Sequence, residues 1–219
     1  QSHTSIHISG LPQWAKYNLT QVGVNAVYER GPWTFALAAV HGWANIDSSR
    51  IDFGTPAFAS YNGGITGVLA EAAYYYAVGQ QGRIVPKAAI EYTHFAVDAF
   101  TETGGIFPIS ASSYSGDRTR LIVGAEAGHY WIVDQKVVDL AGYAKLIGNV
   151  SQNMGAISFV SGGFPVTVQG LRESDLGVDA GATLSVNFTR TIRAYLAYDG
   201  KFRSNFQSHT GTLGLDMRW

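Results

Sequence analysis

The sequence predicts an all-β protein, an antiparallel transmembrane β-barrel of the outer-membrane type. In nine segments, apolar side chains alternate with polar or small ones, as expected of strands whose two faces meet different surroundings. The segments are 10–13 residues long, whereas strands of soluble proteins average about 5–6 residues and a tilted membrane strand needs about 9–11. Short and long connections also alternate along the chain, which is typical of outer-membrane barrels.

The first four segments each place aliphatic and aromatic side chains on one face. In residues 33–43, for example, Trp33, Leu37 and Trp43 fall on the apolar face, opposite Thr34 and Gly42. The same alternation predicts the other strands of this half. The four predicted strands are residues 20–29, 33–43, 66–78 and 84–95.

The last five segments alternate more regularly. Residues 176–188 place Leu176, Leu184 and Phe188 on one face and Asp179 on the other, without a break. The terminal segment alternates up to its last residue, which is aromatic. The five predicted strands are residues 120–131, 137–149, 176–188, 191–202 and 209–219.

Charged side chains avoid the apolar face of every predicted strand. Because a barrel can keep its lumen wet while lipid covers its outer face, we expect these charges to line the lumen. Either they form a wall with a role in transport, or they simply form ion pairs with one another in a hydrated lumen; for individual residues we favour the second. The expected lumen charges are Glu29, Glu71, Lys87, Glu91, Arg120, Glu126, Asp139, Lys145, Asp179, Arg193, Asp199, Lys201, Asp216 and Arg218.

The connections predict which end of the barrel faces the periplasm. Counting back from a periplasmic Trp219 places every short turn inside and every long loop outside, except for a short outer turn at 203–207. The short turns are predicted at 30–32, 79–82, 132–135 and near 190, and the long Gly/Ser-rich loops at 44–65, 97–119 and 150–175.

Aromatic residues of the apolar face gather at the two ends of the predicted strands. Amphipathic rings concentrate where headgroups meet hydrocarbon, so two aromatic girdles are expected. The periplasmic girdle would contain Tyr28, Trp33, Tyr76, Trp131, Phe188 and Trp219, and the outer girdle Trp43, Tyr92, Tyr198 and Phe202.

The composition of the 219 residues agrees with a protein embedded in a lipid bilayer. Charged residues make up 14% of the chain, the net charge is −1, and cysteine is absent. A near-zero net charge gives no electrostatic basis for binding nucleic acid. No apolar run is long enough for a membrane-spanning helix. Because the chain begins at Gln1 rather than Met, we expect a processed or partial polypeptide.

Several stretches resemble the C-terminal β-domain of bacterial autotransporters, the translocators of type V secretion. The resemblance covers about residues 19–219 and departs at Trp219, where phenylalanine is commoner. It is carried by residues 39–54 (AVHGWANIDSSRIDFG), 85–105 (VPKAAIEYTHFAVDAFTETGG), 164–170 (FPVTVQG) and 196–219 (LAYDGKFRSNFQSHTGTLGLDMRW).

The resemblance implies an outer-membrane barrel of a Gram-negative bacterium that exports or displays a passenger at the cell surface. It implies twelve strands, of which about nine are present here, together with a pore helix and passenger upstream in the same polypeptide. Residues 1–18 would then be an outer loop or the end of a preceding strand, and residues 19–219 the C-terminal portion of the barrel domain. The lumen charges would contact the pore helix or the passing chain, and a monomeric barrel is expected.

The terminal strand has a second role by resemblance, as the signal that the barrel-assembly machinery recognises. The residues of this expected signal are Leu213, Leu215, Met217 and Trp219. The simpler interpretation is that they form the last lipid-facing strand, and the two interpretations are compatible.

We expect neither enzymatic activity nor a cofactor. The six histidines lack the spacing of metal ligands, and the serine-rich residues 110–117 lack a G-x-S-x-G motif. The main alternative is a small complete barrel, porin-like or adhesive, in which residues 4–9 (TSIHIS) supply a tenth strand. An outer-membrane enzyme and a soluble all-β module are less favoured.

Overall fold

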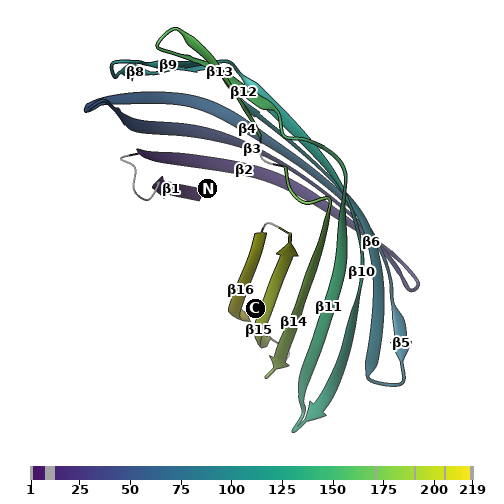
Figure 1. The fold of residues 1–219 in the computed structure, drawn as a ribbon. Coiled ribbons are helices and arrows are strands. Elements are labelled where there is room, and N and C mark those ends of the chain that lie inside the picture. Colours follow the sequence, from purple (N-terminus) through teal and green to yellow (C-terminus); the bar gives the residue numbers. More distant parts are fainter. Residues whose placement is uncertain (1, 8–12, 171, 190, 205, 218–219) are drawn as a thin grey trace.

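The computed structural model describes residues 2–7, 13–170, 172–189, 191–204 and 206–217. Its main element is a single antiparallel sheet that curls into an open half-barrel (Figure 1). Neighbouring strands follow the order β1-β2-β3-β4-β6-β10-β11-β14-β15-β16, and a smaller sheet has the order β13-β12-β9-β7. Among the described residues, no helix is long and apolar enough to span a membrane.

Most strands of the main sheet are longer than a bilayer crossing requires. These strands are β1 (Ser2–His7), β2 (Gln13–Arg30), β3 (Trp33–Asp52), β4 (Thr55–Tyr74), β6 (Gly82–Val97), β10 (Tyr114–Val133), β11 (Lys136–Asn153), β14 (Leu176–Asn187), β15 (Ile192–Arg203) and β16 (Phe206–Met217). The shorter strands are β5 (Tyr76–Val78), β7 (Phe100–Thr101), β8 (Thr103–Gly104), β9 (Ile109–Ala111), β12 (Ala156–Ser161) and β13 (Phe164–Gln169).

All nine predicted strands are present, and the structure adds others. The predicted segment 66–78 is divided at Tyr75, whose backbone N–H donates to the carbonyl of Pro32 (2.7 Å) and leaves the ladder between β4 and β5. β1 pairs with the first part of β2 as a tenth strand of the main sheet. The expected number of about nine was therefore too low, because pairing extends beyond the segments that alternate most clearly.

The strand register joins the apolar faces of neighbouring strands into one continuous surface. Val123 lies opposite both Ala88 of β6 and Leu146 of β11, and Leu146 in turn lies opposite Val178 of β14. The same face continues to Leu213 of β16 through Leu196 of β15. Each apolar face was assigned from its own strand, so the register is an independent confirmation of the assignment.

The three predicted long loops are wrong as loops, because most of their residues form strands. β3 and β4 continue through residues 44–65 as one hairpin, closed by Phe53 and Gly54, which both have positive φ (46° and 86°). Positive φ at both central residues is the geometry of a tight type I′ hairpin. Residues 97–119 and 150–175 supply β7, β8, β9, β12, β13 and parts of β10 and β11. Glycine and serine in these segments indicate the turns, but pairing between strands places most of the other residues in the sheets.

The short turns agree with the predicted positions. Asp134 and Gln135 connect β10 to β11 with positive φ (48° and 66°), and Gly31 connects β2 to β3. We refer to this end of the sheet as the short-turn end, and to the opposite end, which carries the β3–β4 hairpin tip and the smaller sheet, as the long-hairpin end.

The described chain lacks the core of an ordinary soluble domain. Its buried apolar residues are mostly alanines such as Ala57, Ala73 and Ala89, whereas large aliphatic side chains on the convex face stay exposed, including Leu146 (58%) and Leu213 (82%). An apolar surface this extensive requires a covering medium other than water. A lipid bilayer satisfies that requirement without any interior core.

Candidate functional site

The concave face of the sheet carries the charged groups, and Arg83 organises the cluster nearest the short-turn end. Arg83 binds Asp139 through two parallel hydrogen bonds (Nη1–Oδ2 2.6 Å and Nη2–Oδ1 3.0 Å). It also donates to Glu126 (3.3 Å), which accepts from Lys87 Nζ (3.4 Å). Because these residues come from β6, β10 and β11, the cluster ties three strands together across the concave wall.

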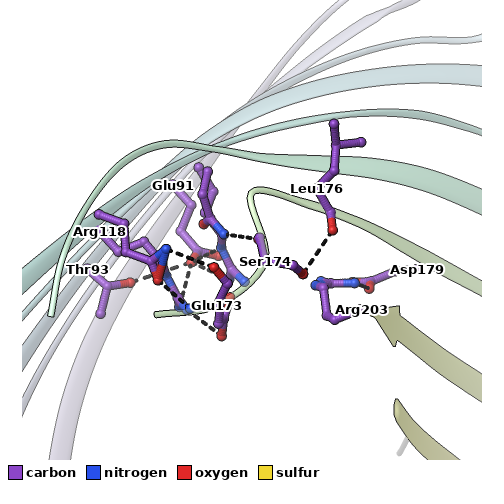
Figure 2. A network of polar contacts seen from close by, with 11 residues as sticks. Glu91, Thr93, Arg118, Glu173, Ser174, Leu176, Asp179 and Arg203 are labelled. Carbon is purple, nitrogen blue, oxygen red and sulfur yellow. Dashed lines mark hydrogen bonds and ion pairs between the residues drawn. The ribbon is translucent and has the colours of Figure 1, made fainter. Parts of the chain in front are cut away.

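A second cluster lies closer to the long-hairpin end (Figure 2). Arg120 donates to Glu91 from Nε (2.9 Å) and also from Nη2. Arg118 approaches the same carboxylate from Nη2 (3.9 Å) and pairs with Glu173 through Nη1 (2.7 Å). Figure 2 shows Glu91, Arg118 and Glu173 together beneath the curved ribbon of the sheet. Glu173 belongs to the connection between β13 and β14, so this ion pair joins the connection to the barrel wall.

Two amides of β11 hold the same connection against the wall. Gln152 accepts the backbone N–H of Glu173 (2.7 Å) and donates to its carbonyl (3.2 Å), while Asn149 donates to the carbonyl of Ser174 (2.7 Å). The fixed backbone at residues 173–175 therefore lies over the concave face rather than away from it. Arg118 Nε, Asn149 Oδ1 and Glu173 Oε2 are buried here without a hydrogen-bond partner among the residues that the structure describes.

A third group of polar contacts lies on the C-terminal strands. Arg203 donates to Asp179 (2.8 Å), and the Tyr143 hydroxyl donates to Asp199. Lys145 places its ammonium 5.0 Å from the centre of the Tyr143 ring, a cation–π arrangement. Polar contacts thus extend along the concave wall from β6 to β15.

The expected lumen charges all lie on the face opposite the apolar one wherever the structure describes them, but only some form ion pairs. Those in ion pairs are Lys87, Glu91, Arg120, Glu126, Asp139 and Asp179. Among the described residues, no ion pair within 4.0 Å involves Glu29, Glu71, Lys145, Arg193, Asp199, Lys201 or Asp216, and Arg218 lies outside the described residues.

Sequence reasoning missed three arginines of this wall. Arg83, Arg118 and Arg203 each lie one or two residues beyond a predicted strand segment. Their spacing could have identified them, because Arg83 shares its face with Lys87, Arg118 with Arg120, and Arg203 with Lys201. The missed signal was therefore the continuation of the two-residue period past the apolar part of the strand.

The concave wall changes character toward its N-terminal strands. A groove of about 510 Å³ runs over β2, β3, β4 and β6, and small or uncharged residues such as Gly23, Ala38, Val40 and Gly67 line most of it. Glu91 and Thr93 close one side. This half of the concave face can accept a closely packed apolar segment, whereas the other half offers charges.

The expected girdle aromatics lie on the exposed convex face wherever they are described. Trp33 packs edge-on against Tyr74 (4.9 Å between ring centroids), His41 against Trp43 (4.6 Å), and the Tyr198 hydroxyl hydrogen-bonds His209 Nδ1 (2.8 Å). The described members are Tyr28, Trp33, Trp43, Tyr76, Tyr92, Trp131, Phe188, Tyr198 and Phe202, all at least 36% exposed. Trp219 lies outside the described residues.

The expected assembly signal lies on the edge strand of the main sheet. Leu213, Leu215 and Met217 project from β16 with exposed fractions of 82%, 59% and 59%, and within the described part of the chain β16 pairs with β15 alone. Trp219 again lies beyond the described residues. The three described side chains continue the apolar surface up to this free edge.

A separate polar cluster fixes the tip of the β3–β4 hairpin. Arg50 binds the Glu102 carboxylate through Nε (2.9 Å) and Nη2 (2.8 Å), while the buried Asp52 accepts the backbone N–H of Ile106 (2.8 Å) and of Phe107. The N–H groups of Phe107 and Ile106, together with Arg50, lower the pKa of Asp52 below its ordinary value. The segment between β8 and β9 is therefore held against the hairpin.

The residues considered for other chemistry are dispersed or have structural partners. No group of three or more His, Cys, Asp or Glu suited to a metal ion occurs in the part of the chain that the structure describes. In the serine-rich stretch, Ser110 hydrogen-bonds Thr101 (3.1 Å) and Ser112 donates to the Ser158 carbonyl (3.2 Å). These contacts join the strands of the smaller sheet.

Comparison with known proteins places this geometry in context. A family model described as the autotransporter β-domain matches residues 1–199. Among solved structures, the translocator domain of the autotransporter NalP from Neisseria meningitidis aligns with a TM-score of 0.69 at 17% identity, covering 95% of this chain and 68% of that one. At this identity the structural match shows the fold.

Two curated relatives, each described as an extracellular serine protease of Serratia marcescens, also match. One is 23% identical over 223 residues, covering 97% of this chain and 21% of the relative. The other is 24% identical over 200 residues, covering 86% of this chain and 19% of the relative. The chain therefore spans about a fifth of the length of the curated relatives it matches.

Proposed function

The chain belongs to the autotransporter β-domain family, and from this premise we propose that it forms part of a translocator that exports or displays a passenger encoded in the same polypeptide. Membership of the family places the chain in the outer membrane of a Gram-negative bacterium. The observation that carries the proposal is one curved sheet with a continuous apolar convex face and a charged concave wall. Such a sheet can line an aqueous passage through lipid.

The concave wall is proposed to contact the chain inside the barrel. Its small-residue groove over β2 to β6 suits a closely packed helix, and the charged clusters around Arg83 and Arg120 suit a hydrated polypeptide. The unpartnered polar atoms of Arg118, Asn149 and Glu173 support this role, because buried polar atoms ordinarily find partners. Lumen placement of all the charges on this face is part of the same proposal.

The other expected roles depend on the barrel and are part of the same proposal. The convex aromatics would mark the two membrane interfaces, with the short-turn end in the periplasm and the long-hairpin end outside. The apolar side chains of β16 would be read by the barrel-assembly machinery during insertion. The division into residues 1–18 and a barrel portion at 19–219, like a monomeric barrel, belongs to the same expectation.

The test uses the full-length gene product expressed in a Gram-negative host. An epitope is placed upstream of Gln1, and antibody binding is measured on intact cells and on permeabilised cells. We expect surface staining that disappears when β16 is deleted, since the barrel then cannot assemble. An epitope that is detected only after permeabilisation, while the barrel is folded in the outer membrane, would contradict the proposal.

One observation favours the small complete barrel as a second candidate. β1 supplies a tenth strand at residues 2–7, close to the expected 4–9, and ten is an even number as bacterial barrels require. However, β1 pairs only with β2 and β16 only with β15 among the described residues, so the sheet remains open. Efficient insertion of residues 1–219 alone as a closed, ion-conducting barrel would favour this candidate over the translocator.

A further inference from the structure

A band of polar side chains crosses the convex face near the long-hairpin end. One row consists of Asn18, Asn45 and Asn62, which lie directly opposite one another on β2, β3 and β4. A second row, four residues nearer the membrane centre, crosses five strands from β3 to β11. Its members are His41, Thr66, His94, Asp117 and Asn153.

This polar band begins where the apolar surface ends. The next row toward the short-turn end contains Val24, Val68 and the girdle residue Tyr92, with exposed fractions of 71%, 38% and 41%. At the same end of the C-terminal strands, Leu176 and Phe202 keep the convex face apolar. The band is thus a local feature of strands β2 to β11, at the level where headgroups replace hydrocarbon.

The chemistry of the band suits sugar hydroxyls better than phosphate. Neither row contains lysine or arginine, and Asp117 of the second row is negatively charged. An anionic group is therefore not attracted to the band. Side-chain amides offer both donors and acceptors, as hydroxyl groups require. Within the described chain, the amides of Asn45 and Asn62 have no hydrogen-bond partner, and both residues are exposed.

An aromatic surface lies between the two rows. Trp43 is 54% exposed and stands edge-on to His41, whose Nδ1 hydrogen-bonds Thr66 Oγ1 (2.8 Å). Beside Trp43 on β4 is Gly64, where even a Cβ would meet only ordinary contacts, the nearest at 3.7 Å. The rows are about 13 Å apart along the strand, which leaves room for sugar rings between them.

From this placement we infer that the polar band binds the saccharide headgroup of a glycolipid in the outer leaflet. The amides of Asn45 and Asn62 bind sugar hydroxyls, and the indole of Trp43 covers the apolar face of a ring. Acyl chains of the same lipid continue down the apolar surface past Val68. The inference rests on the proposed orientation, with the long-hairpin end outside.

The test places the full-length gene product in nanodiscs of phosphatidylethanolamine and phosphatidylglycerol with an uncharged glycolipid, a diglucosyl diacylglycerol. Native mass spectrometry then measures the glycolipid that stays bound. The double variant Asn45→Leu/Asn62→Leu should retain about tenfold less, as expected for the loss of two hydrogen bonds. The control Asn187→Leu makes the same change at an asparagine of the concave face, outside the small-residue groove over β2 to β6, and should retain the wild-type amount.

Several outcomes decide the matter. Equal retention by the wild type and the double variant overturns the inference, as does an equal loss of phosphatidylglycerol, which indicates general lipid contact. If the double variant folds poorly, Trp43→Leu tests the same band with the same expected loss. Surface exposure of the upstream epitope is measured in parallel on intact cells. If the double variant loses glycolipid but still displays the epitope, the two claims are separate, because the proposed translocation fails only if the wild-type epitope stays inside.

Discussion

At the scale of single residues, Asp52 shows how a side chain far from the bilayer can fix the shape of the long-hairpin end. It lies nine residues beyond Trp43 along β3, or about 30 Å for an extended strand. Its carboxylate accepts two backbone N–H groups from the segment that follows β8 and lies beside Arg50 (3.4 Å). Ordering of this segment therefore depends on a negative charge.

The lowered pKa of Asp52 predicts a pH-dependent hairpin tip. Its carboxylate stabilises the docked segment above the ordinary aspartate pKa of about 3.9, and this contribution is lost as pH falls through the lowered folded-state value. Asp52→Asn should make protection of the Ile106 and Phe107 amides weak and independent of pH between about 2 and 5. Hydrogen exchange corrected for intrinsic rates measures this, and a mutant with wild-type protection would contradict it.

Arg83 is the residue on which the first charged cluster depends. Arg83→Ala leaves Asp139 without its bidentate partner and Glu126 with Lys87 as its described ion-pair partner, in a region where these side chains are 21–28% exposed. The expected loss of stability is about 1–3 kcal/mol. It is measured as the unfolding midpoint of the detergent-solubilised barrel. Lys201→Ala, which removes an exposed charge of the same face, should cost less than about 0.5 kcal/mol; equal losses would refute a special role for Arg83.

At the scale of the element, a strand of this sheet has two faces with opposite requirements. Leu184 and Thr183 are neighbours in β14, but Leu184 lies on the convex face and is 42% exposed, whereas Thr183 lies on the concave face. Both residues belong to the same strand and differ in the face on which they lie. Any difference between substitutions at these sites therefore reports the surroundings of each face.

Arginine substitutions at these two positions give a direct comparison. Leu184→Arg should destabilise the inserted barrel by about 2–4 kcal/mol, since a cation on the lipid face near the bilayer midplane costs that much. Thr183→Arg should be tolerated because the concave face is polar. The measurement is the folded fraction in outer-membrane preparations, resolved by heat-modifiable gel mobility. Similar folded fractions for the two variants would exclude lipid as the medium on the convex face.

At the scale of the whole molecule, the two ends of the sheet differ in construction. The short-turn end is closed by tight turns such as Asp134–Gln135, whereas the long-hairpin end carries the β3–β4 hairpin and the smaller sheet. A membrane barrel displays its longer connections outside the cell. This asymmetry is the basis of the proposed orientation, which can be tested independently of any passenger.

The absence of cysteine from the 219 residues makes the orientation measurable. Thr55→Cys at the hairpin tip should react with a membrane-impermeant maleimide on intact cells, whereas Gln80→Cys in a short turn should react only after permeabilisation. The unsubstituted protein provides the background. The reverse pattern would invert the proposed orientation and place the polar band at the inner leaflet.

The sequence alone determined the position of nine strands and the apolar and polar face of each. These depend on a local two-residue period and on the cost of placing a charge in hydrocarbon, and both can be read without knowing which strands pair. The register then joined nine separately assigned faces into one surface.

Only the tertiary structure decided how far the strands continue beyond the bilayer and which charges meet. The hairpin beyond Trp43, the smaller sheet, and the contacts of Arg83 and Arg118 depend on register between segments far apart in the chain. Outside the membrane, water surrounds both faces, so the apolar alternation that reveals a strand is lost. Pairing there is set by backbone hydrogen bonds and cross-strand contacts, which do not require an alternation of apolar side chains in the sequence.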